Sequence, residues 1–213
     1  VLSTPSYTAY LKIAEGCNNR CAFCVIPSLR GRYRSRTFES LLEEAGRLAD
    51  GGVKELIVVA QDITRYGTDL YGRRRLGELL TALCQMPFHW VRLHYLYPDE
   101  VDDELLDVIA SQPKIPHYID IPIQHANDGI LKAMNRRGTK AEISDLLRRM
   151  REKMPDLVLR TSIIVGLPGE GEAEFEELCQ FMNEHEFQRA GVFPFSPEEG
   201  TPAAAMPDQV DPG

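Results

Sequence analysis

Short apolar segments alternate with helical patterns along most of this 213-residue chain, and that alternation restricts the fold more than any other feature. Each apolar segment has the length and composition of a buried strand, and leucines and alanines at helical spacing follow most of them. The segments expected to be strands are residues 10–14, 55–60, 90–93, 118–122, 157–165 and 190–195. This alternation predicts an α/β fold with a mostly parallel sheet and right-handed crossovers.

The expected helices complete about six strand–helix units. They cover residues 40–50, 76–83, 101–110, 130–134, 140–154 and 172–185. Six units are fewer than the eight of a closed barrel, so the expected architecture is an open partial (β/α)6 TIM-like barrel. In such folds the loops after the carboxyl ends of the strands share one face, and that face carries the chemistry.

The domain organisation follows from length and from the two ends. With 213 residues and 43% apolar content, the chain fits one domain of above-average size. We expect that domain at residues 9–200, with an N-terminal linker at 1–8 and a C-terminal linker at 201–213. Such ends are typical of one domain cut from a longer protein.

Charge and hydropathy exclude some classes of partner. The net charge is −8, which argues against a general affinity for the nucleic-acid backbone, although the arginine-rich stretch 30–36 forms a local basic segment. No apolar run approaches the roughly 20 residues that cross a bilayer, and the N-terminus lacks a signal-peptide pattern. We therefore expect a cytoplasmic protein with no membrane partner.

Three of the five cysteines lie within eight residues, in a loop after the first expected strand. Cys17, Cys21 and Cys24 are one ligand short of a closed tetrahedral site, so a metal centre held here keeps one open position. Cys84 and Cys179 stand alone in expected helices and are interpreted as small core residues. The alternative for the three cysteines is a non-catalytic zinc site completed by a distant histidine.

The spacing Cys-x3-Cys-x2-Cys, with Phe23 before the third cysteine, resembles the radical S-adenosylmethionine (SAM) superfamily. The segment 162–170 resembles that superfamily's fifth-strand motif, although Ser162 stands where a glycine often begins it. Residues 16–27, 30–31 and 34–36 resemble the methylthiotransferase branch, and the resemblance runs across nearly the whole chain. The fold it implies is the partial barrel of the radical SAM type.

The resemblance also implies the cofactors, a [4Fe-4S] cluster and SAM. Cys17, Cys21 and Cys24 would hold three irons of the cluster, and SAM would chelate the fourth. The candidate SAM contacts are Phe23, Gln124, Arg160, Ser162 and Gly166. For Arg160 the alternative is an ion pair with a buried acid, for Gln124 it is bonding to backbone groups, and for Gly166 it is an ordinary turn.

Segments 61–72, 96–98 and 120–125 resemble those methylthiotransferases that modify an aspartate of a small-subunit ribosomal protein. The alternative is a transfer-RNA adenosine methylthiotransferase, which typically has serine where His125 stands. The implied reaction uses a 5′-deoxyadenosyl radical for β-methylthiolation and needs an electron donor. The protein would contact nucleic acid only indirectly, through the ribosome. Family members carry an N-terminal domain with a second cluster and a C-terminal β-barrel, so we expect this chain alone not to complete the reaction.

Overall fold

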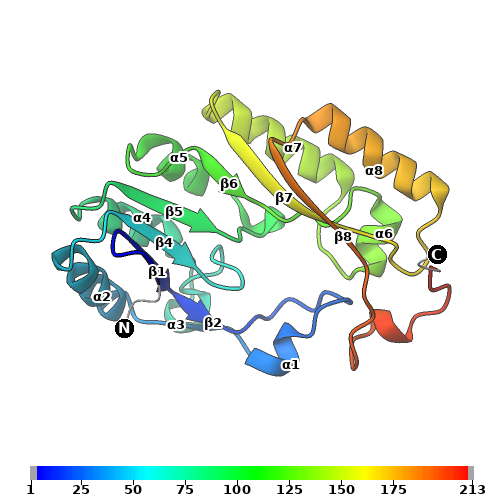
Figure 1. Cartoon of the computed structure of the whole chain (residues 1–213), viewed down its shortest axis with the longest axis horizontal. Coiled ribbons are helices and arrows are strands. Elements are labelled where there is room, and N and C mark those ends of the chain that lie inside the picture. The colour runs from blue at the N-terminus through cyan, green and yellow to red at the C-terminus, as the bar shows by residue number, and fades with distance from the viewer. Residues whose placement is uncertain (1–3, 211–213) are drawn as a thin grey trace.

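The computed structural model describes residues 4–210 and has the expected α/β architecture (Figure 1). The parts of the two predicted linkers at residues 1–3 and 211–213 lie outside the described residues. Every expected strand is present and pairs in parallel with its neighbours. These strands are β1 (Thr8–Lys12), β4 (Glu55–Val59), β5 (Trp90–His94), β6 (Tyr118–Asp120), β7 (Val158–Val165) and β8 (Arg189–Pro194).

The six parallel strands form two three-stranded ladders, in the orders β1-β4-β5 and β6-β7-β8. The two ladders lie side by side at β5 and β6 (Figure 1), where the Leu96 N–H donates to the Asp120 carbonyl at 3.1 Å. Prolines 116 and 122 flank β6, and proline has no N–H to give to a ladder. This composition keeps β6 to three residues, and the predicted mostly parallel sheet is divided next to it, between β5 and β6.

The first expected strand, residues 10–14, is divided in the structure. β1 ends at Lys12, and residues 14–15 form a separate strand β2 (Ala14–Glu15), which pairs antiparallel with β3 (Arg34–Ser35). This small ladder closes the base of a loop that spans residues 16–33, and that loop contains the three clustered cysteines. The sequence pattern did not predict β3, because two residues are too few to show a period.

Helices cover the outer face of the strands (Figure 1). The long ones match the expected segments to within a few residues, and α2 begins earlier than expected because Thr37 accepts a hydrogen bond from Ser40 N–H and caps it. They are α2 (Phe38–Asp50), α4 (Leu76–Cys84), α5 (Asp103–Ser111), α7 (Lys140–Lys153) and α8 (Glu172–His185). The short ones are α1 (Ile26–Arg30), α3 (Thr68–Tyr71), α6 (Asp128–Ala133), η1 (Pro98–Glu100) and η2 (Ala203–Ala205).

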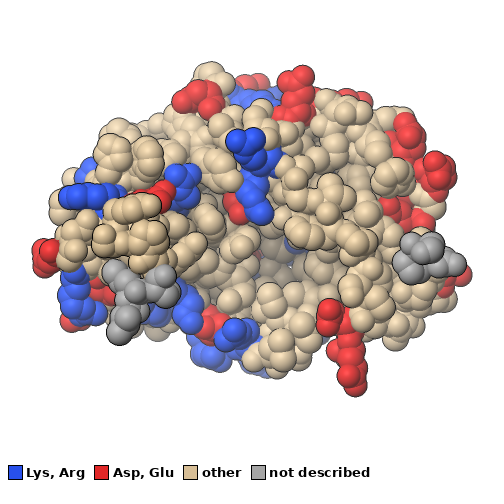
Figure 2. All heavy atoms as spheres, in the orientation of Figure 1, with Lys and Arg blue, Asp and Glu red and all other residues tan. Residues whose placement is uncertain are grey.

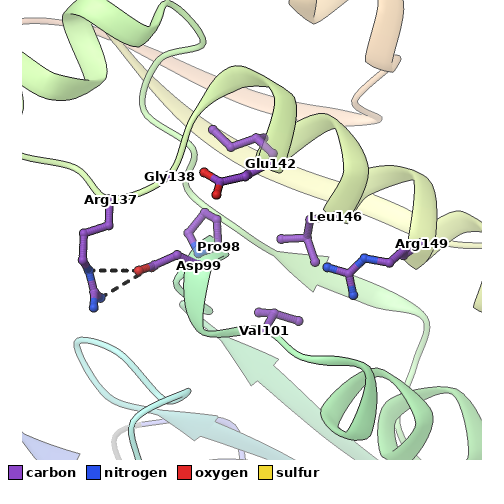
Figure 3. A pocket seen from close by; sticks show the side chains of 9 residues that line it. Pro98, Asp99, Val101, Arg137, Gly138, Glu142, Leu146 and Arg149 are labelled. Carbon is purple, nitrogen blue, oxygen red and sulfur yellow. Dashed lines mark hydrogen bonds and ion pairs between the residues drawn. The ribbon is translucent and has the colours of Figure 1, made fainter.

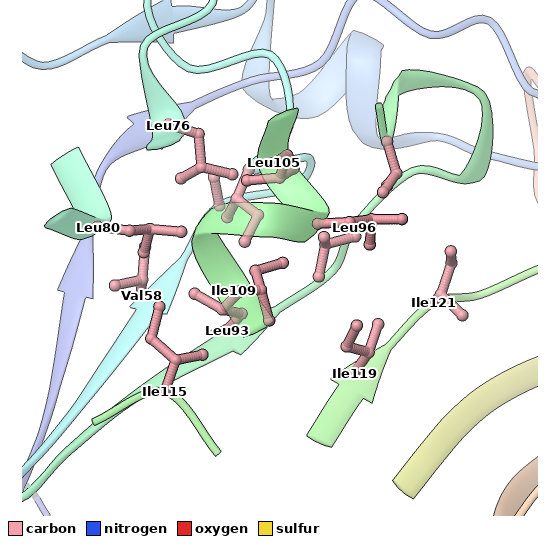
Figure 4. Packing of buried hydrophobic residues seen from close by; sticks show 14 of the residues in the cluster. Val58, Leu76, Leu80, Leu93, Leu96, Leu105, Ile109, Ile115, Ile119 and Ile121 are labelled. Atoms are coloured by element: carbon pink, nitrogen blue, oxygen red, sulfur yellow. The ribbon is translucent and has the colours of Figure 1, made fainter. Parts of the chain in front are cut away.

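The main core lies between the strands and this helical layer. Figure 4 shows Val58 and Leu93 of the strands against Leu80 of α4 and Ile109 of α5, all nearly or fully buried. Each such aliphatic side chain contributes roughly 1.5–3 kcal/mol of burial free energy. Packing on this face fixes the strands, so the loops at their carboxyl ends are held in place.

The segment after residue 200, expected as a linker, begins with packed residues. Thr201 and Ala203 are buried, and the Ala203 N–H donates to the Ala22 carbonyl at 2.9 Å in the cysteine loop. At the other end, β1 begins at Thr8, inside the predicted linker 1–8. Across residues 4–210, the helices are all too short or too polar to cross a lipid bilayer.

Candidate functional site

The cysteine loop follows β2 and is shaped by its own backbone. Gly16 has φ +84°, and a Cβ there would lie 2.3 Å from the Arg32 carbonyl oxygen, so only glycine fits. The Cys17 N–H donates to the Gly31 carbonyl at 3.2 Å, and the Asn18 side chain accepts from Tyr33 N–H at 3.0 Å. These bonds fold the two limbs of the loop against each other.

A buried carboxylate ties this loop to the loop after β4. Asp62 is 1% exposed and accepts a hydrogen bond from the Asn19 side-chain amide at 3.1 Å. The Tyr33 hydroxyl donates to the Asp62 backbone carbonyl at 2.9 Å. Burial raises the pKa of the Asp62 carboxyl, while its hydrogen bonds with Thr64 and Asn19 act in the opposite direction. The two loops are thus fixed to each other beside the cysteines.

Cys17, Cys21 and Cys24 line one cavity of about 250 Å³. All three are free thiols, and burial raises the pKa of the Cys17 and Cys24 thiols. The remaining walls come from the rest of the cysteine loop and the start of α1, from the loops after β4, β5, β6 and α6, and from the middle of β7. The other lining residues are Asn19, Phe23, Ile26, Gln61, Tyr95, Leu96, Tyr97, Pro122, Gln124, Arg136 and Ser162.

The donors in this cavity suit an iron–sulfur cluster with one open iron. Three cysteine sulfurs from one loop can each hold a different iron, which is one fewer than a fully ligated cluster needs. Gln61 adds a buried acceptor, because its Oε1 has no hydrogen-bond partner among the described residues. Within residues 4–210, no group of three or more His, Cys, Asp or Glu side chains could hold a single metal ion.

Two residues that the sequence did not single out contact Cys21. The Tyr97 hydroxyl lies 3.8 Å from the Cys21 sulfur, and a guanidinium nitrogen of Arg136 lies 4.0 Å from it. Arg136 also stacks over the Tyr97 ring at 4.1 Å from the centroid. Burial raises the pKa of the Tyr97 hydroxyl, so it stays protonated and can donate to sulfur. No local spacing could reveal this contact, because more than a hundred positions separate Arg136 from Cys21 in the sequence.

Three of the five predicted SAM contacts line the thiol cavity: Phe23, Gln124 and Ser162. Gln124 N–H donates to the Ser162 carbonyl at 2.9 Å, which joins the loop after β6 to β7. Gln124 has φ +72° and Tyr95, on the same cavity, has φ +68°. Two non-glycine residues in this strained region at one cavity are typical of a functional site.

Arg160 and Gly166 are not among the residues that line this cavity. One guanidinium nitrogen of Arg160 lies 2.8 Å from both carboxylate oxygens of buried Asp120, so the ion pair that was the alternative is present. Gly166 has φ +76° and lines a separate cavity beside α8, of about 360 Å³. The SAM roles of all five residues stay predictions.

A further cavity of about 360 Å³ lies between η1 and α7 (Figure 3). Arg137 at its mouth pairs with Asp99 at 2.9 Å, and its side chain also donates to the Asn19 side-chain oxygen at 3.2 Å. None of the predicted site residues lines this cavity. Arg137 therefore lines this cavity and also contacts the cysteine loop.

Comparisons with known proteins agree with this geometry. Residues 11–182 match the family model described as the Radical SAM superfamily. The chain is 52% identical over 211 residues to ribosomal protein uS12 methylthiotransferase RimO of Clostridioides difficile strain 630, covering 99% of this chain and 48% of that protein. It is 55% identical over 209 residues to RimO of Geobacter sulfurreducens, covering 98% of this chain and 47% of that protein. The chain thus spans about half the length of these curated relatives.

Among solved structures, the radical SAM methyltransferase TsrM of Kitasatospora setae, determined with cobalamin and a [4Fe-4S] cluster, has a similar fold. The TM-score is 0.75 at 18% sequence identity, over 92% of this chain and 38% of that one. At this identity the likeness concerns the fold alone, and it agrees with the partial barrel predicted from six strand–helix units.

Proposed function

The chain belongs to the radical SAM superfamily, and on that premise we propose that residues 9–200 form a radical SAM domain that binds a [4Fe-4S] cluster and SAM. The observation that carries the proposal is the convergence on one cavity of three free thiols and a buried glutamine oxygen that has no hydrogen-bond partner within residues 4–210. Residues 1–8 and 201–213 are proposed as the connections to further segments.

Cys17, Cys21 and Cys24 would hold three irons. When bound, the cluster would supply the one electron for reductive cleavage of SAM to methionine and a 5′-deoxyadenosyl radical, which would abstract hydrogen from an unactivated carbon. The protein's residues orient the reactants and exclude water. Tyr97 and Arg136 place a hydroxyl and a cation beside the Cys21 sulfur, and such groups tune the potential of a cluster.

Phe23, Gln124 and Ser162 are proposed to contact SAM, which is supported by their position in the same cavity as the three cysteines, and Gln61 adds an acceptor there. Arg160 uses a single guanidinium nitrogen for Asp120 and retains other N–H groups for the SAM carboxylate. Gly166 is proposed to let the adenine approach the backbone, because a Cβ there would meet nothing within 4 Å.

The similarity to RimO proteins supports a transferase in which this domain starts β-methylthiolation of an aspartate in ribosomal protein uS12. That substrate is favoured over transfer RNA because the relatives reported above are named for uS12. A ribosomal substrate also favours a cytoplasmic location. Because the chain covers 48% of such a relative, the complete reaction is proposed to need the remaining segments and an electron donor.

The test incubates the reconstituted chain anaerobically with dithionite and SAM, alone, with uS12 and with a transfer RNA. We expect 5′-deoxyadenosine and methionine in every sample and no methylthiolated product. Robust methylthiolated uS12 from this chain alone would refute the need for further segments. Methylthiolated transfer RNA would overturn the substrate, and no SAM cleavage at all would overturn the proposed function.

A further inference from the structure

The surface outside the cysteine loop is basic although the whole chain has a net charge of −8. Four arginines of the loop and of β3 are exposed, and Figure 2 shows basic side chains gathered over β2 and beside α1. With two exposed aliphatic residues of α1 they form what we call the α1 patch. Its members are Arg20, Ile26, Leu29, Arg30, Arg32 and Arg34.

The cations of this patch are almost free of acidic partners. Among the described residues, Arg20, Arg32 and Arg34 make no ion pair, and Arg30 reaches Glu15 only at 3.9 Å. Elsewhere the arginines are mostly paired, as Arg148 is with both Asp145 and Glu152 at 2.6 Å. Unpaired cations concentrated on one face attract an acidic partner and speed its approach.

The patch also has an apolar centre. Leu29 is 71% exposed and Ile26 is 36% exposed, both on α1. An apolar centre within a charged rim is the usual anatomy of a protein–protein contact. RNA-binding surfaces instead offer aromatic rings for base stacking, and in this stretch Tyr33 is only 4% exposed, with its hydroxyl bonded to Asp62. These features favour a protein over an RNA.

The patch lies directly outside the predicted cluster. A hollow of about 350 Å³ is lined by Arg20, Arg32 and Cys17. Cys17 and Asn19 line both this hollow and the thiol cavity, so these two residues separate the hollow from the cavity that would hold the cluster. A partner docked on the patch would therefore lie close to the place where an electron must enter.

We propose that the α1 patch is the docking surface for an acidic one-electron donor protein, an inference that rests on the proposed function. The donor, in its reduced form, passes one electron to the oxidised cluster near Cys17 and is itself oxidised by one electron. Such contacts are weak and small, typically below roughly 1,200 Å² of total buried surface. Affinity is then mostly electrostatic and falls with salt.

The test compares two double variants with equal change of charge. The patch variant is Arg20→Glu with Arg32→Glu. The control variant is Lys54→Glu with Arg189→Glu, two exposed residues at the amino ends of β4 and β8, whereas the cysteine loop lies at the carboxyl ends of the strands. An acidic flavodoxin in its hydroquinone form serves as the probe, and stopped-flow absorbance follows reduction of the reconstituted cluster. Dithionite is the small reductant that needs no docking.

We expect the patch variant to be reduced by the flavodoxin at least about tenfold more slowly than the control variant at low salt, with equal rates for dithionite. Leu29→Ser should weaken flavodoxin binding without changing its salt dependence. Equal rates of reduction by flavodoxin in the two variants would overturn the proposal. An equally slowed reduction by dithionite in the patch variant would also overturn it, because the defect would then lie in the cluster itself.

Binding is measured in parallel with the cluster-free chain, so that a failure of the cluster to form, which would count against the proposed function, still leaves the docking surface tested. Flavodoxin should bind the parent chain and the control variant, and this binding should be lost in the patch variant. If the patch instead binds a single-stranded RNA oligonucleotide or a second copy of the chain, and not the flavodoxin, the proposal is wrong.

Discussion

The Nε2 of His125 lies 3.7 Å from a carboxylate oxygen of Glu170, and both side chains are buried. The ring's Nδ1 accepts from Asn127 N–H at 3.0 Å, so the neutral ring carries its hydrogen on Nε2 and turns it toward Glu170. The other oxygen of Glu170 accepts from the backbone N–H of Gly166 at 2.8 Å and of Leu167 at 3.2 Å. One carboxylate therefore accepts two backbone hydrogen bonds in the loop after β7 and lies beside the His125 ring of the loop after β6, whose Nε2 has no hydrogen-bond partner among the described residues.

Glu170→Ala should destabilise the chain by about 1–3 kcal/mol, because two backbone donors lose their shared acceptor. SAM affinity should fall with it, since Gly166 belongs to the same loop. Urea unfolding and a SAM binding titration measure the two effects. Glu176→Ala, at an exposed position of the following helix α8, is the control. Equal unfolding free energies for the two variants would contradict the role of Glu170.

Removing the tie between the cysteine loop and the β4 loop should affect cluster assembly. In Asp62→Ala the Asn19 amide loses its acceptor, so the loop limb that contains Cys17 and Cys21 becomes less ordered. We expect less iron retained per chain after anaerobic reconstitution, and a lower melting temperature. Asp69→Ala, which removes exposed bonds to Ser35, serves for comparison. Iron retention no lower than in that variant would show that Asp62 does not position the loop.

Arg136 should raise the reduction potential of the bound cluster, because a cation near a cysteine sulfur favours the more negative, reduced form. Arg136→Met is expected to move the midpoint potential in the negative direction in an electron paramagnetic resonance titration. Arg137→Met is the control, since Arg137 lies next in sequence but pairs with Asp99 and Glu100. An equal shift in both variants would point to overall charge as the cause.

His94 should make stability depend on pH. Burial lowers its pKa, Arg92 and Arg160 act in the same direction, and Asp120 and Glu55 oppose them. A folded-state pKa below the unfolded value of roughly 6.5 gives stability that is present above that pH and lost as pH falls through the folded value. The loss should be small, because His94 is only partly buried and solvent screens the charges around it.

Urea unfolding of the cluster-free chain between about pH 7 and pH 5 measures this loss. His94→Gln should flatten the decline in stability, whereas His89→Gln, at an exposed position, should leave it unchanged. If stability declines as steeply in His94→Gln as in the parent chain, His94 does not cause the pH dependence.

Periodicity predicted the barrel because most strands of the body bury side chains against helices, as Ala9 and Leu11 do in β1. β8 is the exception, since it is exposed along nearly its whole length. It could not predict the β2–β3 ladder, which is only two residues long, or the break at β6, where prolines end the pairing. Spacing identified the three cysteines because one short loop contains them all. Gln61, Tyr97 and Arg136 come from three separate loops, and only the folded chain brings them to the same cavity.

Anaerobic reconstitution with iron and sulfide tests the central claim, that Cys17, Cys21 and Cys24 hold a [4Fe-4S] cluster with an open iron. We predict a brown chain with about four irons, whose reduced paramagnetic spectrum changes on adding SAM. Cys21→Ser should lose the colour, whereas Cys84→Ser and Cys179→Ser, which change cysteines outside the cavity, should keep it. A colourless chain that retains one zinc, or equal cluster loss from Cys21→Ser and Cys84→Ser with the fold intact by circular dichroism, would contradict the claim.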